Sequence, residues 1–344
     1  MVRAFSVCLI LSFEICLSAS LKPSGEQIEV FSRAIDMVFA DSFSQAYELI
    51  GEMPDTIPEK PLYHLLYGSV MHAEMLDSED FTEEELFFDH IDSSIDFLKA
   101  WTDDNSDDPW GFLFLGSAYG YKSILHVHKK RWLKSLVNGL KARGKFSKAI
   151  KIDSTIYDAY TGLGNYHYWS SVKLGKYIPF LPDNREKGLT ELRLAADSSL
   201  FSRKPALAGL AWALIEEREY REAIRIGEMF YGESGGGRNS LWILGGIYWR
   251  NGNLIRAAKY YNILLELFTR AGNQNNYNII FCRYRLGVCA FKLGEINKAT
   301  ADFEAVLSRE VTPEIEKRHK KTYKKARQYL EKIDKIVKER KKSL

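Results

Sequence analysis

Apolar residues recur along most of the chain at spacings of three and four, the periodicity of helices with one buried face. One stretch shows the pattern most clearly, with a polar turn in its middle: Leu241, Leu244, Gly245, Tyr248, Asn251, Gly252, Asn253, Ala257, Tyr261 and Leu264. The Asn-Gly-Asn turn interrupts the spacing, which then resumes. This stretch predicts two antiparallel helices joined by a tight turn. No segment shows the alternation with period two that indicates strands.

The same frame recurs before and after this unit, and it is marked by pairs of small residues among large apolar ones. These pairs are Gly68 and Ser93, Gly116 and Ala142, Gly164 and Gly188, Ala211 and Ala223, Gly245 and Ala257, and Gly287 and Ala299; an earlier unit has Ala46. Small residues let the two helices of a hairpin cross closely, and the large ones fill the space between hairpins. We therefore expect about seven helical hairpins over residues 27–313, stacked around a continuous core.

The offsets of these residues resemble the tetratricopeptide (TPR) repeat, with Gly or Ala at positions eight and twenty and large residues between them. The resemblance implies an all-α fold, a right-handed α-solenoid of antiparallel helix hairpins. The segment from Glu314 to Leu344 follows Pro313 and has an apolar stripe at helical spacing. It resembles the C-terminal capping helix that ends such arrays.

In each hairpin we call the first helix A and the second helix B. Three consecutive units, the second to the fourth, are longer than the others between these two helices. Shared between the two helices, the extra residues lengthen each one by nearly two turns. In the third unit, residues 121–140 are expected to be helical extension; in the fourth, Lys176 to Asn184 predicts a proline-rich loop. The insertions predict a ridge beside the concave face. Either this ridge is one wall of a binding site, or it packs on itself and only stabilises the array.

The composition indicates a folded chain, and its charge is divided unevenly. The 344 residues are 46% hydrophobic and 27% charged, which excludes a disordered chain. The net charge of +3 gives no reason to expect nucleic acid as a partner. From Glu314 onward, however, there are 13 Lys and Arg against 5 Asp and Glu. The C-terminal helix could therefore contact an anionic membrane as well as cap the array.

The first residues have the pattern of a secretory signal peptide at residues 1–20. A basic start precedes a short apolar run, and Ser18-Ala19-Ser20 offers small residues for cleavage. We expect an exported protein, periplasmic or secreted; whether the segment is cleaved or retained stays open. Outside this segment the chain has two cysteines, Cys282 and Cys289. They are two turns apart on one predicted helix, which is too far for a mutual disulfide. They are expected to be buried thiols.

No motif of catalysis or metal binding is present, so we expect neither enzymatic activity nor a cofactor. His126 and His128 point to different sides of a helix, and we interpret them as solvated basic surface. His167 occupies a core position, where a buried histidine with a hydrogen-bond partner is expected. The acidic pairs at 103–104 and 107–108 fall in a turn and should cap the next helix.

The aromatic residues, 13% of the chain, gather where helix A of a TPR-like unit faces the concave side. Rings offer large contact areas at low entropic cost. The candidate groove comprises Tyr121, Asn165, Tyr168, Trp169, Trp212, Trp242, Trp249, Arg250, Tyr284 and Phe291, with Glu216 and Lys292 beside them. We expect a scaffold that binds a protein or peptide partner there. The alternative is a small hydrophobic or glycan ligand between groove and ridge. The identity of the partner and the oligomeric state stay open.

Overall fold

The computed structural model describes residues 20–53, 59–175, 182–270 and 275–342, and within these ranges the chain forms fifteen helices and no strand. The helices are, in order, α1 (Gly25–Phe39), α2 (Phe43–Gly51), α3 (Glu59–Ser78), α4 (Glu84–Asp104), α5 (Pro109–His128), α6 (Trp132–Ile152), α7 (Asp158–Leu174), α8 (Arg185–Ser198), α9 (Arg203–Glu217), α10 (Tyr220–Glu233), α11 (Arg238–Arg250), α12 (Leu254–Arg270), α13 (Asn276–Lys292), α14 (Ile296–Leu307) and α15 (Pro313–Lys342).

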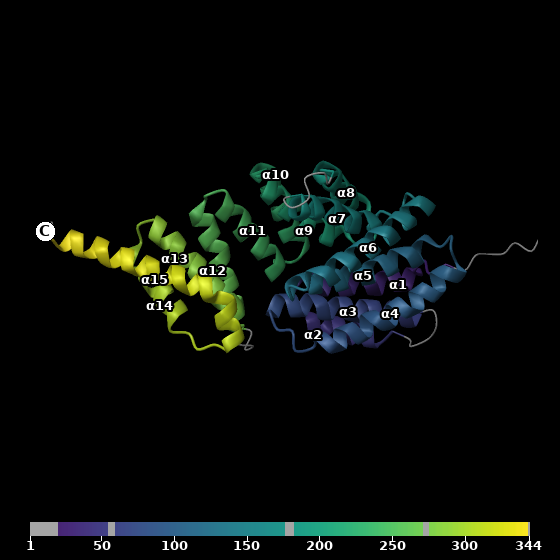
Figure 1. The fold of residues 1–344 in the computed structure, drawn as a ribbon, viewed down its shortest axis with the longest axis horizontal. Helices are drawn as coiled ribbons and strands as arrows, with labels where there is room; N and C mark the ends of the chain where they lie inside the picture. The colour runs from purple at the N-terminus through teal and green to yellow at the C-terminus, as the bar shows by residue number, and fades with distance from the viewer. Residues whose placement is uncertain (1–19, 54–58, 176–181, 271–274, 343–344) are drawn as a thin grey trace, which may run out of the picture.

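Consecutive helices pack as hairpins, from α1 with α2 to α13 with α14, and α15 packs on the last hairpin. Figure 1 shows α1 to α8 stacked in one half of the molecule and α11 to α15 in the other, with α15 at the C-terminal end. The expected all-α solenoid is confirmed. Its buried apolar side chains form three clusters that follow one another along the array, one from α1 to α7, one from α7 to α13 and one from α13 to α15.

The small residues at the repeat positions allow the close helix crossings that the sequence predicted. A Cβ atom at Gly164 in α7 would lie 2.9 Å from the backbone oxygen of Gly188 in α8 and 2.8 Å from Leu192. A Cβ at Gly116 would lie 2.8 Å from the ring of Phe146. These contacts leave no room for a side chain, so glycine sets the distance between the two helices.

The insertions lengthen helices, as expected for the second and third units. Helices α3 to α6 have 20 or 21 residues each, whereas α9 and α11 have 15 and 13. In the fourth unit α7 ends at Leu174 and α8 begins at Arg185. Of the proline-rich loop predicted between them, residues 176–181 lie outside the described residues, as do residues 1–19 of the predicted signal peptide.

The start of α5 is fixed by the acidic turn before it. The carboxylate of Asp108 accepts hydrogen bonds from the backbone N–H groups of Trp110 and Gly111, so it caps the helix as predicted. The same prediction is wrong for Asp103 and Asp104, which are the last two residues of α4. It also accepts from the indole N–H of Trp101 and the backbone N–H of Leu21, at 2.8 and 2.9 Å. The beginning of the described chain is therefore tied to the third hairpin.

The N-terminal hairpins also contact the C-terminal half of the array, which the sequence did not predict. Phe39 at the end of α1 packs edge-on against Phe230 in α10, with 5.4 Å between ring centroids. Asp77 near the end of α3 forms an ion pair with Arg238 at the start of α11. Glu79, just after α3, pairs with Arg318 in α15. The turns within the first two hairpins are thus linked to α10, α11 and α15.

Histidines and cysteines mostly occupy the interior. His167 is buried with its Nδ1 at 2.6 Å from Glu191, and Cys282 and Cys289 are buried free thiols, as expected. His126 corrects the prediction of a solvated basic surface, because its ring is buried and packs against Phe88 at 5.2 Å. Its neighbour His128 is exposed.

Candidate functional site

Helices α7, α9 and α11 are the helix A members of three successive units, and they lie side by side. Seven of the ten candidate residues lie on these three helices, and Tyr121, Tyr284 and Phe291 lie on α5 and α13, at either side of them. The structure divides the candidates into three groups: an accessible group on α9 and α11, a buried group inside the hairpins, and a group near the C-terminal helix.

The accessible group centres on Trp212 in α9, whose side chain is 39% exposed. The ring lies against the backbone of α11, where a Cβ at Gly246 would meet it at 3.2 Å. One turn further along α9, Glu216 forms an ion pair with Arg250 at the end of α11, at 2.7 Å. An exposed ring, a carboxylate and a guanidinium therefore share one surface across two helices.

Tyr168 is not part of that surface, which corrects its place in the candidate groove. Its side chain is fully buried, and its hydroxyl lies 2.9 Å from the backbone oxygen of Ala213 and 2.9 Å from a carboxylate oxygen of Glu217. Burial and the neighbouring Glu217 raise the pKa of Tyr168. This tyrosine joins α7 to α9 inside the array.

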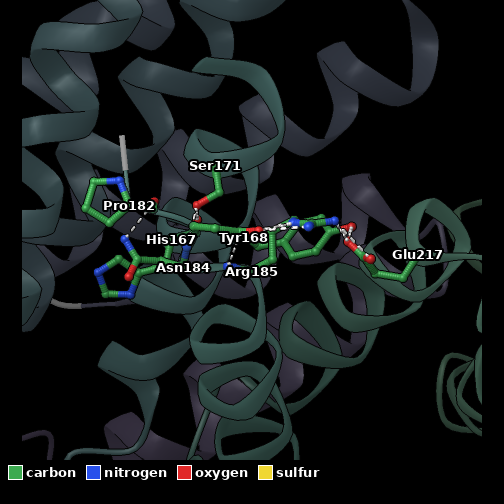
Figure 2. Close-up of polar contacts among 8 residues, drawn as sticks. His167, Tyr168, Ser171, Pro182, Asn184, Arg185 and Glu217 are labelled. Atoms are coloured by element: carbon green, nitrogen blue, oxygen red, sulfur yellow. Dashed lines mark hydrogen bonds and ion pairs between the residues drawn. The ribbon is translucent and has the colours of Figure 1, made fainter. Parts of the chain in front are cut away.

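Glu217 links that buried hydroxyl to a surface network (Figure 2). Its two carboxylate oxygens each lie 3.1 Å from one guanidinium nitrogen of Arg185, at the start of α8. The same guanidinium binds Asp183, which raises the pKa of Arg185. Ser171 in α7 accepts a hydrogen bond from the backbone N–H of Asn184 at 2.9 Å. Asn184 and Arg185, at the start of α8, are therefore held by polar contacts to α7 and α9.

These residues border an open depression of about 380 Å³, beside the fourth-unit insertion. Its rim includes Ser171, Pro182, Asp183, Arg185, Glu216 and Glu217. Pro182, Asp183, Arg185 and Glu216 are exposed, so the depression opens to solvent. An open and polar depression fits an extended chain that runs past it better than an enclosed apolar ligand.

Two other candidates on α7 are half-buried. Trp169 packs at right angles to Tyr168, and the ammonium group of Lys173 lies 5.5 Å from its ring centroid. Asn165 donates to the backbone oxygen of Thr161 at 3.0 Å, and its amide fills the space beside Gly209. Both side chains contribute to packing between neighbouring helices.

The candidates further along the array are partly enclosed by rings of their own or adjacent hairpins. Trp242 contacts Tyr261, Phe268 and Phe281, with centroid distances of 5.4 to 6.1 Å. The guanidinium of Arg285 lies 4.0 Å from the ring centroid of Trp249. Both tryptophans are half-buried, and their rings pack against neighbouring side chains.

The last three candidates lie on the helices that flank α7, α9 and α11: Tyr121 on α5, and Tyr284 and Phe291 on α13. Phe291 packs against Tyr329 of α15 at 5.1 Å, so the C-terminal helix covers one side of it. Tyr284 packs near Phe303 at 6.2 Å. Tyr121 lies in the third unit, beside His72 of α3 at 5.3 Å, and burial raises its pKa. The ten candidates therefore do not form one continuous groove.

The sequence did not single out Arg185 and Glu217, the charged residues at the rim of the depression. Their signal was weak, because charged residues at the ends of helices are common. In the part of the chain that the structure describes, no group of His, Cys, Asp and Glu could hold a metal ion. Among the same residues, no helix is long and apolar enough to cross a membrane.

The chain is similar in structure to solved TPR proteins. A chain of the APC/C hetero-tetramer Cut9–Hcn1 matches with a TM-score of 0.47 and 16% identity, over 82% of this chain and 44% of that one. The C-terminal part of a TPR repeat-containing protein from Cytophaga hutchinsonii matches with a TM-score of 0.43 and 14% identity, over 83% and 97%. A TPR protein from Parabacteroides merdae matches with a TM-score of 0.40 and 13% identity, over 87% and 97%.

No protein-family model and no curated protein matches the chain. At these identities and TM-scores the similarity extends to the architecture and to nothing finer. The chain spans less than half of the Cut9–Hcn1 chain that it matches. The stacked hairpins, their glycine crossings and the helix that packs on the last hairpin define the class by its fold: this is an all-α solenoid of helix hairpins.

Proposed function

We propose that the chain is a non-enzymatic scaffold that binds an extended segment of a partner protein across α9 and α11. The observation that carries this is the exposed ring of Trp212 on the backbone of α11, one turn from the Glu216–Arg250 ion pair. An aromatic anchor beside polar groups is the usual composition of an interface centre.

Site-specific crosslinking tests this proposal. A photoreactive amino acid at position 212, used in cells that make the protein, should capture a discrete partner that mass spectrometry identifies. The purified partner should then bind the Trp212→Ala variant about tenfold more weakly than the native chain. The matched control is Ile255→Ala, because Ile255 is 71% exposed on α12, away from this surface. Equal binding by the native and Trp212→Ala chains would contradict the proposal.

A small polar or glycan ligand in the 380 Å³ depression is the second candidate, supported by the Arg185, Asp183 and Glu217 cluster at its rim. Intrinsic tryptophan fluorescence, titrated with metabolite and glycan pools, tests it. A saturable response that Arg185→Ala abolishes would favour the ligand over the protein partner.

We further propose that the chain is exported and that α15 contributes basic charge at its end. The support for export is the signal-peptide pattern of residues 1–20. Deleting residues 338–344 should weaken co-sedimentation with anionic vesicles at low salt if the C-terminal helix contacts lipid. Unchanged co-sedimentation would leave α15 with its capping contacts alone.

A further inference from the structure

The hairpin of α5 and α6 exposes an unusual amount of apolar surface. Seven of the fourteen strongly exposed large apolar side chains of the described residues lie between positions 124 and 140. Leu133 is 81% exposed and Trp132 is 63% exposed, which are high values for side chains of this size. The others are Ile124, Val127, Leu136, Val137 and Leu140. A contiguous apolar surface of this kind marks an interaction site rather than ordinary scatter.

Helical geometry puts the five of these side chains that belong to α6 on one face of that helix. Leu133, Leu136 and Leu140 follow Trp132 by one, four and eight residues, and this spacing keeps all four on one side of the helix. The opposite side carries Ser135, Ala142, Phe146 and Ala149, which are buried against the array. The apolar face therefore points away from the core and has no described residue covering it.

The charge of the same hairpin is entirely of one sign. Residues 109–152 contain ten Lys and Arg and no Asp or Glu. Lys134, Lys141, Lys145 and Lys148 recur at helical spacing along α6, beside the apolar face. Among the described residues these four lysines form no ion pair, whereas Lys122, Lys129 and Arg131 pair with acids of α4. An uncompensated basic stripe thus flanks the apolar face.

A cleft of about 900 Å³ lies between this face and α4. Leu133, Val137, Lys134 and Lys141 form one wall. The other has the rings of Phe81 and Phe88 and the carboxylates of Glu84, Glu85 and Asp92, of which Glu84 and Asp92 are paired with basic residues of the hairpin. The cleft gives the apolar face depth, so lipid chains near the surface could contact more than the outermost side chains.

We propose that the α5–α6 hairpin is a docking surface for an anionic lipid bilayer. Trp132, Leu133 and Leu136 would insert at the boundary between headgroups and acyl chains, and Lys134 and Lys141 would contact the phosphates. A helix with an apolar face that includes Trp and Leu, next to a face rich in Lys, has the composition of an interfacial membrane helix. The uncompensated positive charge favours this occupant over a second copy of the chain, whose hairpin would carry the same charge.

Vesicle binding tests the proposal with the full chain. Vesicles of equal parts phosphatidylglycerol and phosphatidylcholine should co-sediment the native protein at low salt, and phosphatidylcholine vesicles should co-sediment much less. The double variant Leu133→Ser, Leu136→Ser should bind the anionic vesicles about tenfold more weakly, because it removes inserted apolar groups. Lys134→Glu, Lys141→Glu should weaken binding by about as much. Both pairs of positions are exposed, so both variants should fold.

Two matched controls separate this surface from the rest of the molecule. Ile255→Ser removes an apolar side chain of α12 that is 71% exposed, and it should leave binding unchanged. Lys335→Glu, Lys338→Glu makes the same change of charge on exposed positions of α15 and should weaken binding far less than the α6 variant. Lipids brominated near the headgroup should quench tryptophan emission more in the native chain than in Trp132→Phe.

Several results would overturn the proposal. These are no binding to anionic vesicles, equal binding by the native chain and Leu133→Ser, Leu136→Ser, or equal losses from the α6 and α15 charge variants. A native dimer that dissociates in the same serine variant, with no vesicle binding, would show that the face covers a second copy instead.

Discussion

Arg238 and Asp77 are 161 residues apart in the sequence and form a two-pronged ion pair in the structure. The Nε atom of Arg238 lies 2.9 and 3.0 Å from the two carboxylate oxygens, and its Nη2 lies 2.7 Å from one of them. Its backbone N–H donates to Asp41 at 2.7 Å. Asn275 and Asn278 donate to the backbone oxygen of Asp77. This cluster joins α1 and α3 to α11 and α13.

The first prediction concerns the strength of that link. Asp77→Ala leaves the guanidinium of Arg238 largely buried without its main partner, and it should lower the free energy of unfolding by about 2 to 4 kcal/mol. Chemical denaturation measures this loss. The control is Arg270→Ala, which breaks the exposed Arg270–Glu266 pair and should cost less than about 0.5 kcal/mol. Equal costs for the two variants would mean that the link contributes no special stability.

The second prediction concerns pH. Burial lowers the pKa of His319 to about 4, and its Nε2 lies 3.0 Å from the backbone oxygen of Tyr277. As pH falls below 6.5 the unfolded chain binds a proton at this position, but the folded chain does not until about pH 4. Stability is therefore lost over that window, by about 3 kcal/mol from this one group.

The variant His319→Gln isolates this contribution, because it retains a donor towards Tyr277 and cannot titrate. Denaturation curves at pH 7 and pH 4.5 should show a smaller difference for the variant than for the native chain. If acid destabilises the two proteins equally, His319 is not the group responsible.

The third prediction concerns the glycine crossings. Gly164→Ala should destabilise the fold by about 1 to 3 kcal/mol, because the new Cβ would meet Leu192 and the backbone of Gly188. Gly144→Ala, in α6 with no atom within 4 Å of the added Cβ, should instead stabilise by up to about 1 kcal/mol. Thermal unfolding of both variants should show opposite shifts. A gain in stability for Gly164→Ala would contradict the account of close helix contact.

The fourth prediction concerns processing at the N-terminus. If the signal peptide is cut after Ser20, the backbone nitrogen of Leu21 becomes a charged amine 2.9 Å from the buried carboxylate of Asp108. Mass spectrometry of the exported protein should give Leu21 as its first residue. Asp108→Asn should then destabilise the processed chain more than the unprocessed one, since only the former has the amine. A first residue other than Leu21 would contradict this cleavage site.

The architecture could be predicted because it rests on local spacing. Gly164 and Gly188 have roles that depend on the two helices of one hairpin, so the repeat pattern reveals them. Tyr168 shows the limit of that reasoning. Its repeat position indicated the concave face, but its hydroxyl turns towards Ala213 and Glu217 of the next unit, which a single-unit pattern does not contain.

The contacts that link the two ends could not be predicted. Asp77 and Arg238 are ordinary charged residues in the sequence, and only the curvature of the whole array makes them neighbours. The exposure of Trp132 and Leu133 was hidden for another reason. Apolar residues at helical spacing indicate a buried face, and nothing in one sequence distinguishes a face that meets the core from one that does not.

The Asp77–Arg238 and Glu79–Arg318 pairs have a consequence for how the chain unfolds. In an open array each repeat depends only on its neighbours, so the ends fray first and unfolding spreads inward as in a one-dimensional chain. Here the first hairpins share contacts with α11, α13 and α15, and neither end can open without disturbing the other. We therefore expect hydrogen exchange in α3 and α15 to follow a common opening step, the behaviour of a closed ring rather than a row.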